Sequence, residues 1–170
     1  MSGLVCFSHG KDSSPQATKI NALSVVAQRH GWRTMSVDYR GIDSPEERVN
    51  KLKTQLSAPS KPLVLVGSSM GSYVSLVAAK SLNPVGLFLM APAVNMPGYD
   101  LHGGPPENCR VQIFHGWHDD IVTVDRVLKF AQAHQIETLL LNDNHRLQSS
   151  LPQLEKFFAI FLDEIRQNIG

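Results

Sequence analysis

Short, continuously apolar segments recur along the chain, and most are followed by a polar turn and then a stretch with helical periodicity. Six of these segments have the length and composition of strands: residues 4–8, 34–39, 63–66, 85–90, 111–115 and 136–141. The intervening stretches place apolar residues three and four positions apart, as amphipathic helices do. Strands without polar alternation are typical of a sheet covered on both faces. The pattern predicts an α/β fold, a three-layer sandwich with a mostly parallel sheet of about six strands between helices.

Local signals mark where the helices begin and end. Pro15 suits the first turn of a helix that Asp12 or Ser14 would cap. Residues 44–47, Ser-Pro-Glu-Glu, form a capping box with proline at the first helical position. The last helix runs from about Leu151 to Ile165 and turns apolar side chains, Phe157 among them, toward the core.

Length and composition indicate one globular domain over residues 1–170. Hydrophobic residues make up 42% of the chain and charged residues 18%, and the net charge of +1 favours neither nucleic acid nor a membrane surface as partner. No signal peptide or membrane span is evident, and Cys6 and Cys109 are read as reduced thiols, so we expect a cytoplasmic monomer or homodimer. The longest irregular segment, residues 91–108, is the candidate for a minimal cap.

A small-residue turn joins the third predicted strand to the helix that follows it. Its sequence, Gly67-Ser68-Ser69-Met70-Gly71, matches the pattern G-x-S-x-G. A chain that doubles back this sharply needs small residues at both flanks, and the central Ser69 then points its hydroxyl away from the sheet. The N–H of Met70 would point to the same place. The pentapeptide alone is weak evidence, because Ser69 could merely cap the helix.

Other polar groups follow the carboxyl ends of the neighbouring strands, the edge where parallel sheets bind ligands. A serine, an acid and a histidine occur here in the chain order of α/β hydrolases, with His145 as the candidate base. His9 is its rival, and we interpret it as a structural group that bonds neighbouring loops. Asp119 and Asp120 compete as the acid, because a shift of one residue redirects the carboxylate. Asp143 is too near His145 in sequence for the usual geometry.

Four segments together resemble the α/β-hydrolase superfamily over almost the whole chain: His9-Gly10, residues 67–71, residues 115–122 and Asn144-His145. The resemblance implies Ser69 as nucleophile, His145 as base and, from the pattern H-G-x-x-D-x-x-V, Asp119 as acid. It also implies an oxyanion hole made by the N–H groups of Met70 and Lys11.

Within the superfamily, the chain is similar to small, compact bacterial hydrolases with little or no cap. This similarity implies a minimal α/β-hydrolase fold that lacks the first two strands of the family. It also implies the strand order 2-1-3-4-5-6 in this chain's own count.

The substrate pocket is less well defined by the sequence. Only residues 91–108 could supply a wall, with Met96, Tyr99 and Leu101 as its apolar part. His9 and His102 are further candidates for substrate contact. A Lys11 side chain that faced the cleft would favour an anionic substrate.

These features favour a serine hydrolase that cleaves a carboxylic ester or thioester of a small acyl substrate through an acyl-enzyme on Ser69. One alternative is a non-catalytic ligand-binding or scaffold protein on the same fold, since fold does not fix function. Another is an amide or peptide hydrolase, which the lack of an acidic cluster for an amino terminus disfavours. No nucleotide-binding motif and no metal-ligand set is evident in the sequence, so we expect no cofactor and no metal.

Overall fold

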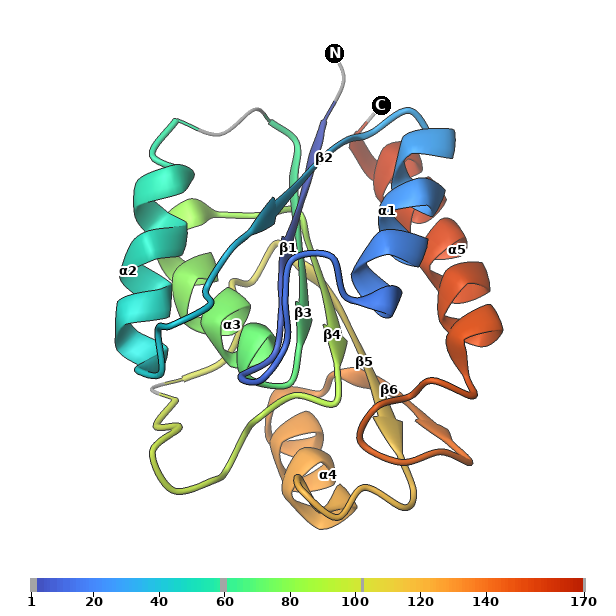
Figure 1. Cartoon of the computed structure of the whole chain (residues 1–170). Helices are drawn as coiled ribbons and strands as arrows, with labels where there is room; N and C mark the ends of the chain where they lie inside the picture. The colour runs from blue at the N-terminus through green and yellow to red at the C-terminus, as the bar shows by residue number, and fades with distance from the viewer. Residues whose placement is uncertain (1–2, 59–60, 102, 170) are drawn as a thin grey trace.

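The computed structural model describes residues 3–58, 61–101 and 103–169. Strands and helices alternate along these residues, apart from β4 and β5, which follow one another directly (Figure 1). In chain order the elements are β1 (Leu4–Ser8), α1 (Thr18–Arg29), β2 (Arg33–Val37), α2 (Pro45–Gln55), β3 (Leu63–Ser68), α3 (Met70–Leu82), β4 (Gly86–Met90), β5 (Arg110–Gly116), α4 (Val124–His134), β6 (Glu137–Leu141) and α5 (Leu151–Ile169).

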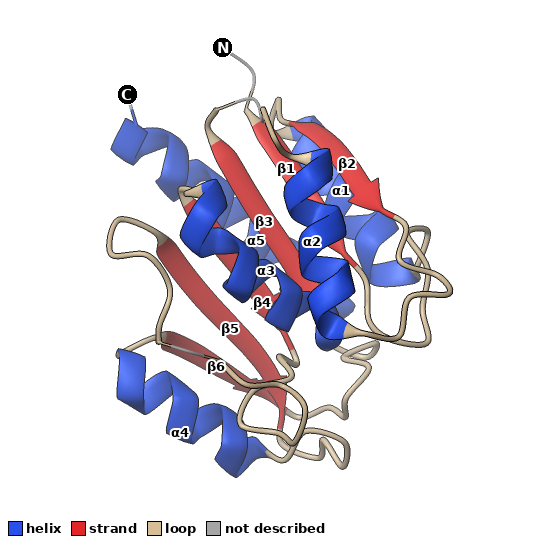
Figure 2. Cartoon of the chain, turned by 90° about the vertical axis from the view of Figure 1, so that its left-hand side faces the viewer, coloured by secondary structure: helices blue, strands red, loops and turns tan. Residues whose placement is uncertain are grey.

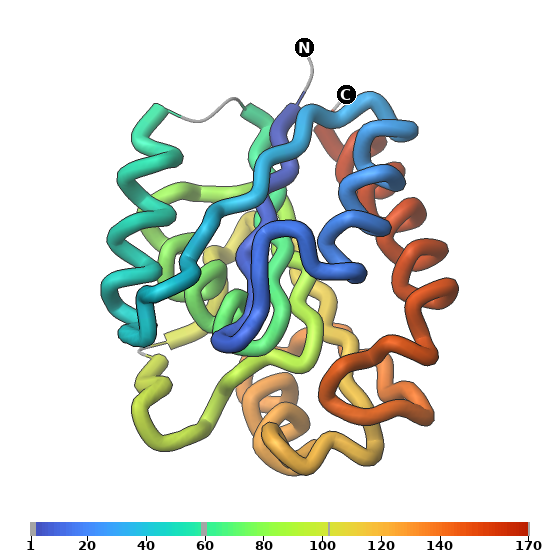
Figure 3. Tube along the Cα trace, viewed as in Figure 1, coloured from blue at the N-terminus to red at the C-terminus, as the bar shows by residue number. Residues whose placement is uncertain are grey.

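The strands form one sheet in the order β2-β1-β3-β4-β5-β6, and every neighbouring pair is parallel. This confirms both the predicted fold class and the predicted strand order. The register sets Ser8 of β1 beside Gly67 of β3 and Gly67 beside Leu89 of β4. Because all strands run the same way, the loops after β1, β3, β5 and β6 meet at one end of the sheet (Figure 3).

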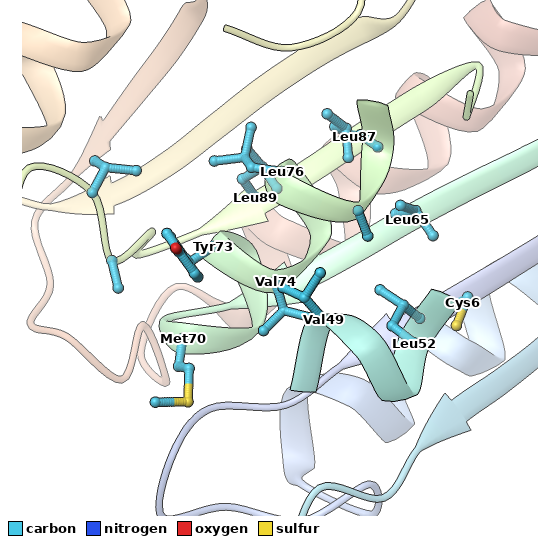
Figure 4. Packing of buried hydrophobic residues seen from close by; sticks show 14 of the residues in the cluster. Cys6, Val49, Leu52, Leu65, Met70, Tyr73, Val74, Leu76, Leu87 and Leu89 are labelled. Carbon is cyan, nitrogen blue, oxygen red and sulfur yellow. The ribbon is translucent and has the colours of Figure 1, made fainter. Parts of the chain in front are cut away.

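Helices cover both faces of the sheet, which explains why its strands are apolar at consecutive positions (Figure 2). Val5 and Phe7 of β1 join the core cluster that contains side chains of α1 and α5. Cys6, between them, joins the cluster on the opposite face, which contains side chains of α2, α3 and α4. Figure 4 shows part of this second cluster, with Val49 of α2 close to Val74 of α3.

Three details differ from the sequence predictions. Helix α1 begins at Thr18 rather than near Pro15, and no side chain caps it, because the residues before it form turns in which Ser14 Oγ accepts from the N–H of Gln16. Strand β2 ends at Val37, two residues earlier than predicted, and the chain turns at Arg40 and Gly41, where the N–H of Ile42 donates to the carbonyl of Tyr39. Phe157 of α5 is only half-buried.

Two further local predictions are confirmed, the cap at Ser44 and the free thiols of the two cysteines. Ser44 caps α2, its Oγ accepting from the N–H of Glu47 at 3.3 Å. Cys6 and Cys109 are free thiols. Among the described residues, no helix combines the length and the hydropathy that crossing a membrane requires.

Candidate active site

Ser69 stands at a sharp turn between β3 and α3. Its backbone adopts φ 54° and ψ −118°, a conformation that few residues other than glycine take. The flanking glycines make this turn possible. A Cβ at Gly71 would lie 1.9 Å from the carbonyl oxygen of Ser8, and one at Gly67 would lie 2.4 Å from the Cα of Ser72. The two glycines therefore allow β1, the turn and α3 to pack in contact.

The imidazole of His145 lies between Ser69 and Asp119. Its Nε2 is 3.0 Å from Ser69 Oγ, and its Nδ1 is 2.7 Å from Asp119 Oδ2. Because the acid is a pure acceptor, Nδ1 carries the ring proton and donates it to the carboxylate. Nε2 is then an acceptor for the serine hydroxyl. Three side chains from three loops thus form one continuous chain of hydrogen bonds, although Asp119 is 50 residues from Ser69 in the sequence.

The Asp119 carboxylate is fully buried and fixed at both oxygens. Oδ1 accepts from the N–H groups of Ile121 and Val122 at 2.9 and 2.8 Å, while Oδ2 faces His145. Burial on its own would raise the pKa of Asp119, but the hydrogen bonds from His145 and from the two backbone N–H groups outweigh it and lower that pKa. The carboxylate is therefore ionised at neutral pH.

The competing acids lie elsewhere. Asp120 is exposed. Asp143 is buried, and its two oxygens accept from the N–H groups of Asn144 and Ser150. This carboxylate shapes the loop that carries His145.

His115 is a neighbour of the acid whose contacts the sequence did not specify. Its buried Nε2 donates to the carbonyl of Val122 at 2.8 Å and lies 3.4 Å from Asp119 Oδ2. Burial lowers the pKa of His115, so the ring is neutral. His118 is exposed instead, with its Nε2 2.8 Å from Asn142 Oδ1.

The loop after β1 passes beside the serine. A Cβ at Gly10 would lie 3.6 Å from the Cβ of Ser69. The ring of His9 is buried, its Nδ1 donating to the carbonyl of Gly10 and its Nε2 accepting from the N–H of Tyr39. Both ring nitrogens are engaged, so the ring joins two loops, as we interpreted from the sequence. Burial lowers the pKa of His9 and keeps it neutral.

A buried arginine on α2 holds this loop from behind. Arg48 is 1% exposed, and its guanidinium donates to the carbonyl oxygens of His9, Gly10 and Lys11 at 3.1–3.3 Å and to that of Ile42 at 2.7 Å. The carbonyls of three consecutive residues therefore point toward one guanidinium. Arg48 was missed, although it shares the apolar face of α2 with Val49 and Leu52, and a charge at such a position is a recognisable signal.

The expected oxyanion donors occupy this same region. Met70 is the first residue of α3, so its N–H has no acceptor within the helix. Lys11 lies on the loop that Arg48 holds and lines the cavity next to Ser69. That these two N–H groups form an oxyanion hole stays a prediction.

A cavity of about 510 Å³ opens beside Ser69. The segment from β1 to the start of α1 forms one side, and the loop that carries His145 contributes another. The described residues that line it are His9, Gly10, Lys11, Asp12, Ser13, Ala17, Thr18, Lys19, Ile20, Ser68, Ser69, Ala93, Met96, Tyr99, Ile121, Val122, His145, Arg146, Gln148 and Leu151.

The predicted pocket residues are only partly in this cavity. His9, Met96 and Tyr99 line it, whereas Leu101 lines a separate cavity of about 80 Å³ against α3. The prediction that Leu101 lines the pocket beside Ser69 is therefore wrong. The reason is that the chain turns toward α3 after Tyr99, where the hydroxyl of Tyr73 donates to the carbonyl of Asp100. His102 lies outside the described residues. No group of three His, Cys, Asp or Glu side chains suited to a metal is found in the described part of the chain.

Solved structures match this fold over nearly the whole chain. A protein from Xanthomonas campestris pv. campestris, described as a candidate hydrolase of the alpha/beta superfamily, is 31% identical, with 96% of this chain and 99% of that chain covered and a TM-score of 0.87. Est1E from Butyrivibrio proteoclasticus is 17% identical, with 98% and 89% covered and a TM-score of 0.81. An α/β serine hydrolase without lid, also from Xanthomonas campestris, is 20% identical, with 91% and 78% covered and a TM-score of 0.74.

The last two structures are so different in sequence that they show only the same fold. The first is similar enough in sequence to show that the two proteins belong to one family. The chain belongs to the α/β-hydrolase superfamily, as the sequence resemblance implied. Within it, residues 4–101 match the model of the family described as Uncharacterised protein family (UPF0227), and this is more than half of the chain. No curated protein matches the chain significantly.

Proposed function

We propose that this chain is a serine hydrolase that cleaves a carboxylic ester or thioester of a small molecule. The hydrogen-bonded series from Ser69 Oγ through His145 to Asp119 carries this proposal. His145 Nε2 takes the hydroxyl proton as Ser69 Oγ attacks the carbonyl carbon. Asp119 stabilises the imidazolium that forms, because its carboxylate faces the protonated Nδ1.

The remaining steps use the groups around the serine. The N–H groups of Met70 and Lys11 stabilise the negative oxygen of the tetrahedral intermediate. His145 then gives its proton to the leaving alcohol or thiol, and the acyl group stays on Ser69. Water, deprotonated by His145, attacks this acyl-enzyme and releases the acid, which restores the serine.

The cavity supports an organic substrate of modest size. Met96, Tyr99, Ile121 and Leu151 give it an apolar lining close to the serine. Met96 and Tyr99 come from the irregular segment after β4, so we propose that residues 91–108 serve as a minimal cap. Among the described residues that line the cavity, Asp12 has the one carboxylate, and a single carboxylate is too little to capture an amino terminus, which favours an ester or thioester over a peptide.

Labelling with a fluorophosphonate, read by intact mass, tests this function directly. We expect one adduct on the unmodified protein and none on Ser69→Ala or His145→Ala, because the reaction needs an activated nucleophile. Ser72→Ala is the matched control. This serine also lies in the first turn of α3, but its Oγ is buried and donates to the carbonyl of Met90, so the label should be retained.

Two results would contradict the proposal. An adduct on Ser69→Ala would place the reactive group elsewhere. A folded, unmodified protein that takes no label would lack an activated serine, and a ligand-binding protein on a hydrolase fold would then be the better description.

A further inference from the structure

Three cationic side chains line the cavity beside Ser69. Lys11 and Lys19 belong to the segment that leads from β1 into α1, and Arg146 directly follows His145. Among the described lining residues, the one side chain that opposes them is the carboxylate of Asp12. The cavity therefore carries an excess of positive charge, although the whole chain has a net charge of only +1.

These cations have no ion-pair partner in the described part of the chain, where the ion pairs all involve other residues. Lys19 is half-buried, and the carboxylates that influence its charge are those of Asp143 and Asp119. Both carboxylates already accept hydrogen bonds at their two oxygens. The ammonium group of Lys19 thus keeps its donors for a group that enters the cavity.

Arg146 is close enough to act on the same place. Its positive charge repels that of Lys19 and contributes to lowering the pKa of the lysine. Two neighbouring cations with no ion-pair partner repel one another, and an anion between them would remove the repulsion. A guanidinium beside an ammonium offers several N–H donors, which suits the oxygens of a carboxylate or a phosphate.

We propose that the substrate carries an anionic group, a carboxylate or a phosphate, that binds Lys19 and Arg146 while its ester or thioester carbonyl lies at Ser69. This inference rests on the proposed hydrolase function. Lys11, exposed at the rim, attracts the same charge. The apolar lining from Met96, Tyr99 and Leu151 contacts the carbon chain of the substrate.

The titration of Lys19 agrees with this geometry. Burial lowers the pKa of Lys19 to about 8, Asp143 and Asp119 act in the opposite direction, and Arg146 lowers it further. The amine is still mostly protonated at neutral pH, so it can donate to an anion. A bound anion would replace the hydration that the ammonium group has lost.

Two esters of equal shape and different charge test the proposal. Mono-p-nitrophenyl adipate ends in a carboxylate, and p-nitrophenyl 6-methylheptanoate has an isopropyl group in its place. We expect kcat/KM to be about tenfold or more higher for the adipate ester, which is the effect of one charge-assisted hydrogen bond. In Lys19→Met and in Arg146→Met this ratio should fall about tenfold. The control Lys129→Met, an exposed lysine of α4 outside the cavity, should leave the ratio as it is.

A binding measurement separates this inference from the catalytic one. In Ser69→Ala, which cannot turn over substrate, calorimetric titration with adipate and with inorganic phosphate at constant ionic strength should show binding. Adding Lys19→Met to that variant should weaken the binding about tenfold. Tighter binding of adipate would identify a carboxylate as the recognised group, and tighter binding of phosphate would identify a phosphate.

The possible failures are distinguishable. If both esters are hydrolysed with equal kcat/KM, or if the ratio survives in Lys19→Met and Arg146→Met, the anionic substrate is excluded while the hydrolase function stands. If neither ester is hydrolysed and no fluorophosphonate adduct forms, yet adipate or phosphate binds through Lys19, the hydrolase function is excluded and the anion site stands.

Discussion

The carboxylate of Asp119 and the imidazole of His145 share a 2.7 Å hydrogen bond, through Oδ2 and Nδ1, in a place where the acid is fully buried. Two backbone N–H groups hold the other carboxylate oxygen, so the acid cannot rotate away from the ring. This pairing determines that the proton of neutral His145 sits on Nδ1 and that Nε2 is free to accept from Ser69. In the proposed mechanism, Asp119 therefore acts by fixing the tautomer of His145.

Asp119→Asn should break this arrangement with little change in shape. The amide NH₂ would donate to Nδ1 of His145, so the ring proton would move to Nε2 and Nε2 could no longer accept from Ser69. We expect kcat for ester hydrolysis to fall by about 10³–10⁴-fold. Asp120→Asn, which neutralises the neighbouring exposed acid, is the matched control and should keep most of the activity. Equal losses in the two variants would contradict the assignment of Asp119 as the acid.

Arg48 provides a second prediction, because its guanidinium holds the carbonyls of the loop that carries Lys11. Arg48→Met would leave four buried or half-buried carbonyl oxygens without this donor, a loss of about 2–5 kcal/mol in the free energy of unfolding. The loop would no longer hold the N–H of Lys11 in the place where we propose that it stabilises the oxyanion. We therefore expect kcat to fall by about 10²-fold while KM changes less.

Two further variants make the Arg48 prediction specific. Arg48→Lys can reach only part of the carbonyl set and should recover part of the stability and of kcat. Lys51→Met is the control, since Lys51 also belongs to α2 and donates to a backbone carbonyl, that of Asp38, and neither of these residues lines the cavity beside Ser69. Urea unfolding and steady-state kinetics measure the two quantities. A loss of stability in Arg48→Met without a fall in kcat would mean that the arginine is structural alone.

The turn at Ser69 depends on the contact between Gly71 and β1. In Gly71→Ala the new methyl group would overlap the carbonyl oxygen of Ser8, a backbone atom that cannot move aside without shifting the sheet. We expect a loss of about 4 kcal/mol or more in the free energy of unfolding, or failure to fold.

Gly41→Ala is the comparison, because its φ is +78° but no atom lies within 4 Å of the added Cβ. Its expected loss is about 1–2 kcal/mol, measured by urea unfolding. Similar values for the two variants would argue against a steric requirement at Gly71.

The sequence predicted the sheet and the place of the site because both follow from local patterns and general topology rules. Apolar runs marked the strands, and parallel strands send their carboxyl ends to one edge, so the loops with Ser69, Asp119 and His145 had to meet there. Choosing Asp119 over Asp120 required more, namely the family pattern, because a periodicity of two or of 3.6 says nothing about the direction of a loop carboxylate.

The contacts that sequence reasoning missed are long-range ones. Arg48 reaches a loop 37–39 residues away, and no local pattern states what a buried guanidinium will bond. Lys19 was overlooked because the helix was expected to begin near Pro15, and the later start at Thr18 puts the lysine in the first turn at the cavity wall. Leu101 was misplaced since the path of an irregular segment depends on tertiary contacts such as Tyr73 with Asp100.

The charge of Lys19 should make the preference for an anionic ester depend on pH. Only the ammonium form donates to the anion, and kcat/KM reports the free enzyme, in which burial lowers the pKa of Lys19 to about 8. The ratio of kcat/KM for the adipate ester to that for the 6-methylheptanoate ester should therefore fall as pH rises through 8. Measuring both esters from pH 6.5 to 9.5 cancels every effect of pH that is common to the hydrolysis of the two. A constant ratio would contradict a role for the Lys19 charge.

The same lysine should lower the stability of the free protein. Below pH 8 the folded chain carries a partly desolvated charge that the unfolded chain keeps in water, so Lys19→Met should be more stable at pH 7, by about 1–2 kcal/mol after allowance for screening. Between about pH 8, the pKa of the folded state, and 10.5, that of the unfolded chain, the unfolded state binds more protons. The unmodified protein should then gain stability relative to the variant as pH rises through this range.

Urea unfolding at pH 7, 8, 9 and 10 measures the difference, with Lys129→Met as the control for the change in net charge. A difference between unmodified protein and Lys19→Met that stays constant across these values would show that Lys19 pays no cost of burial.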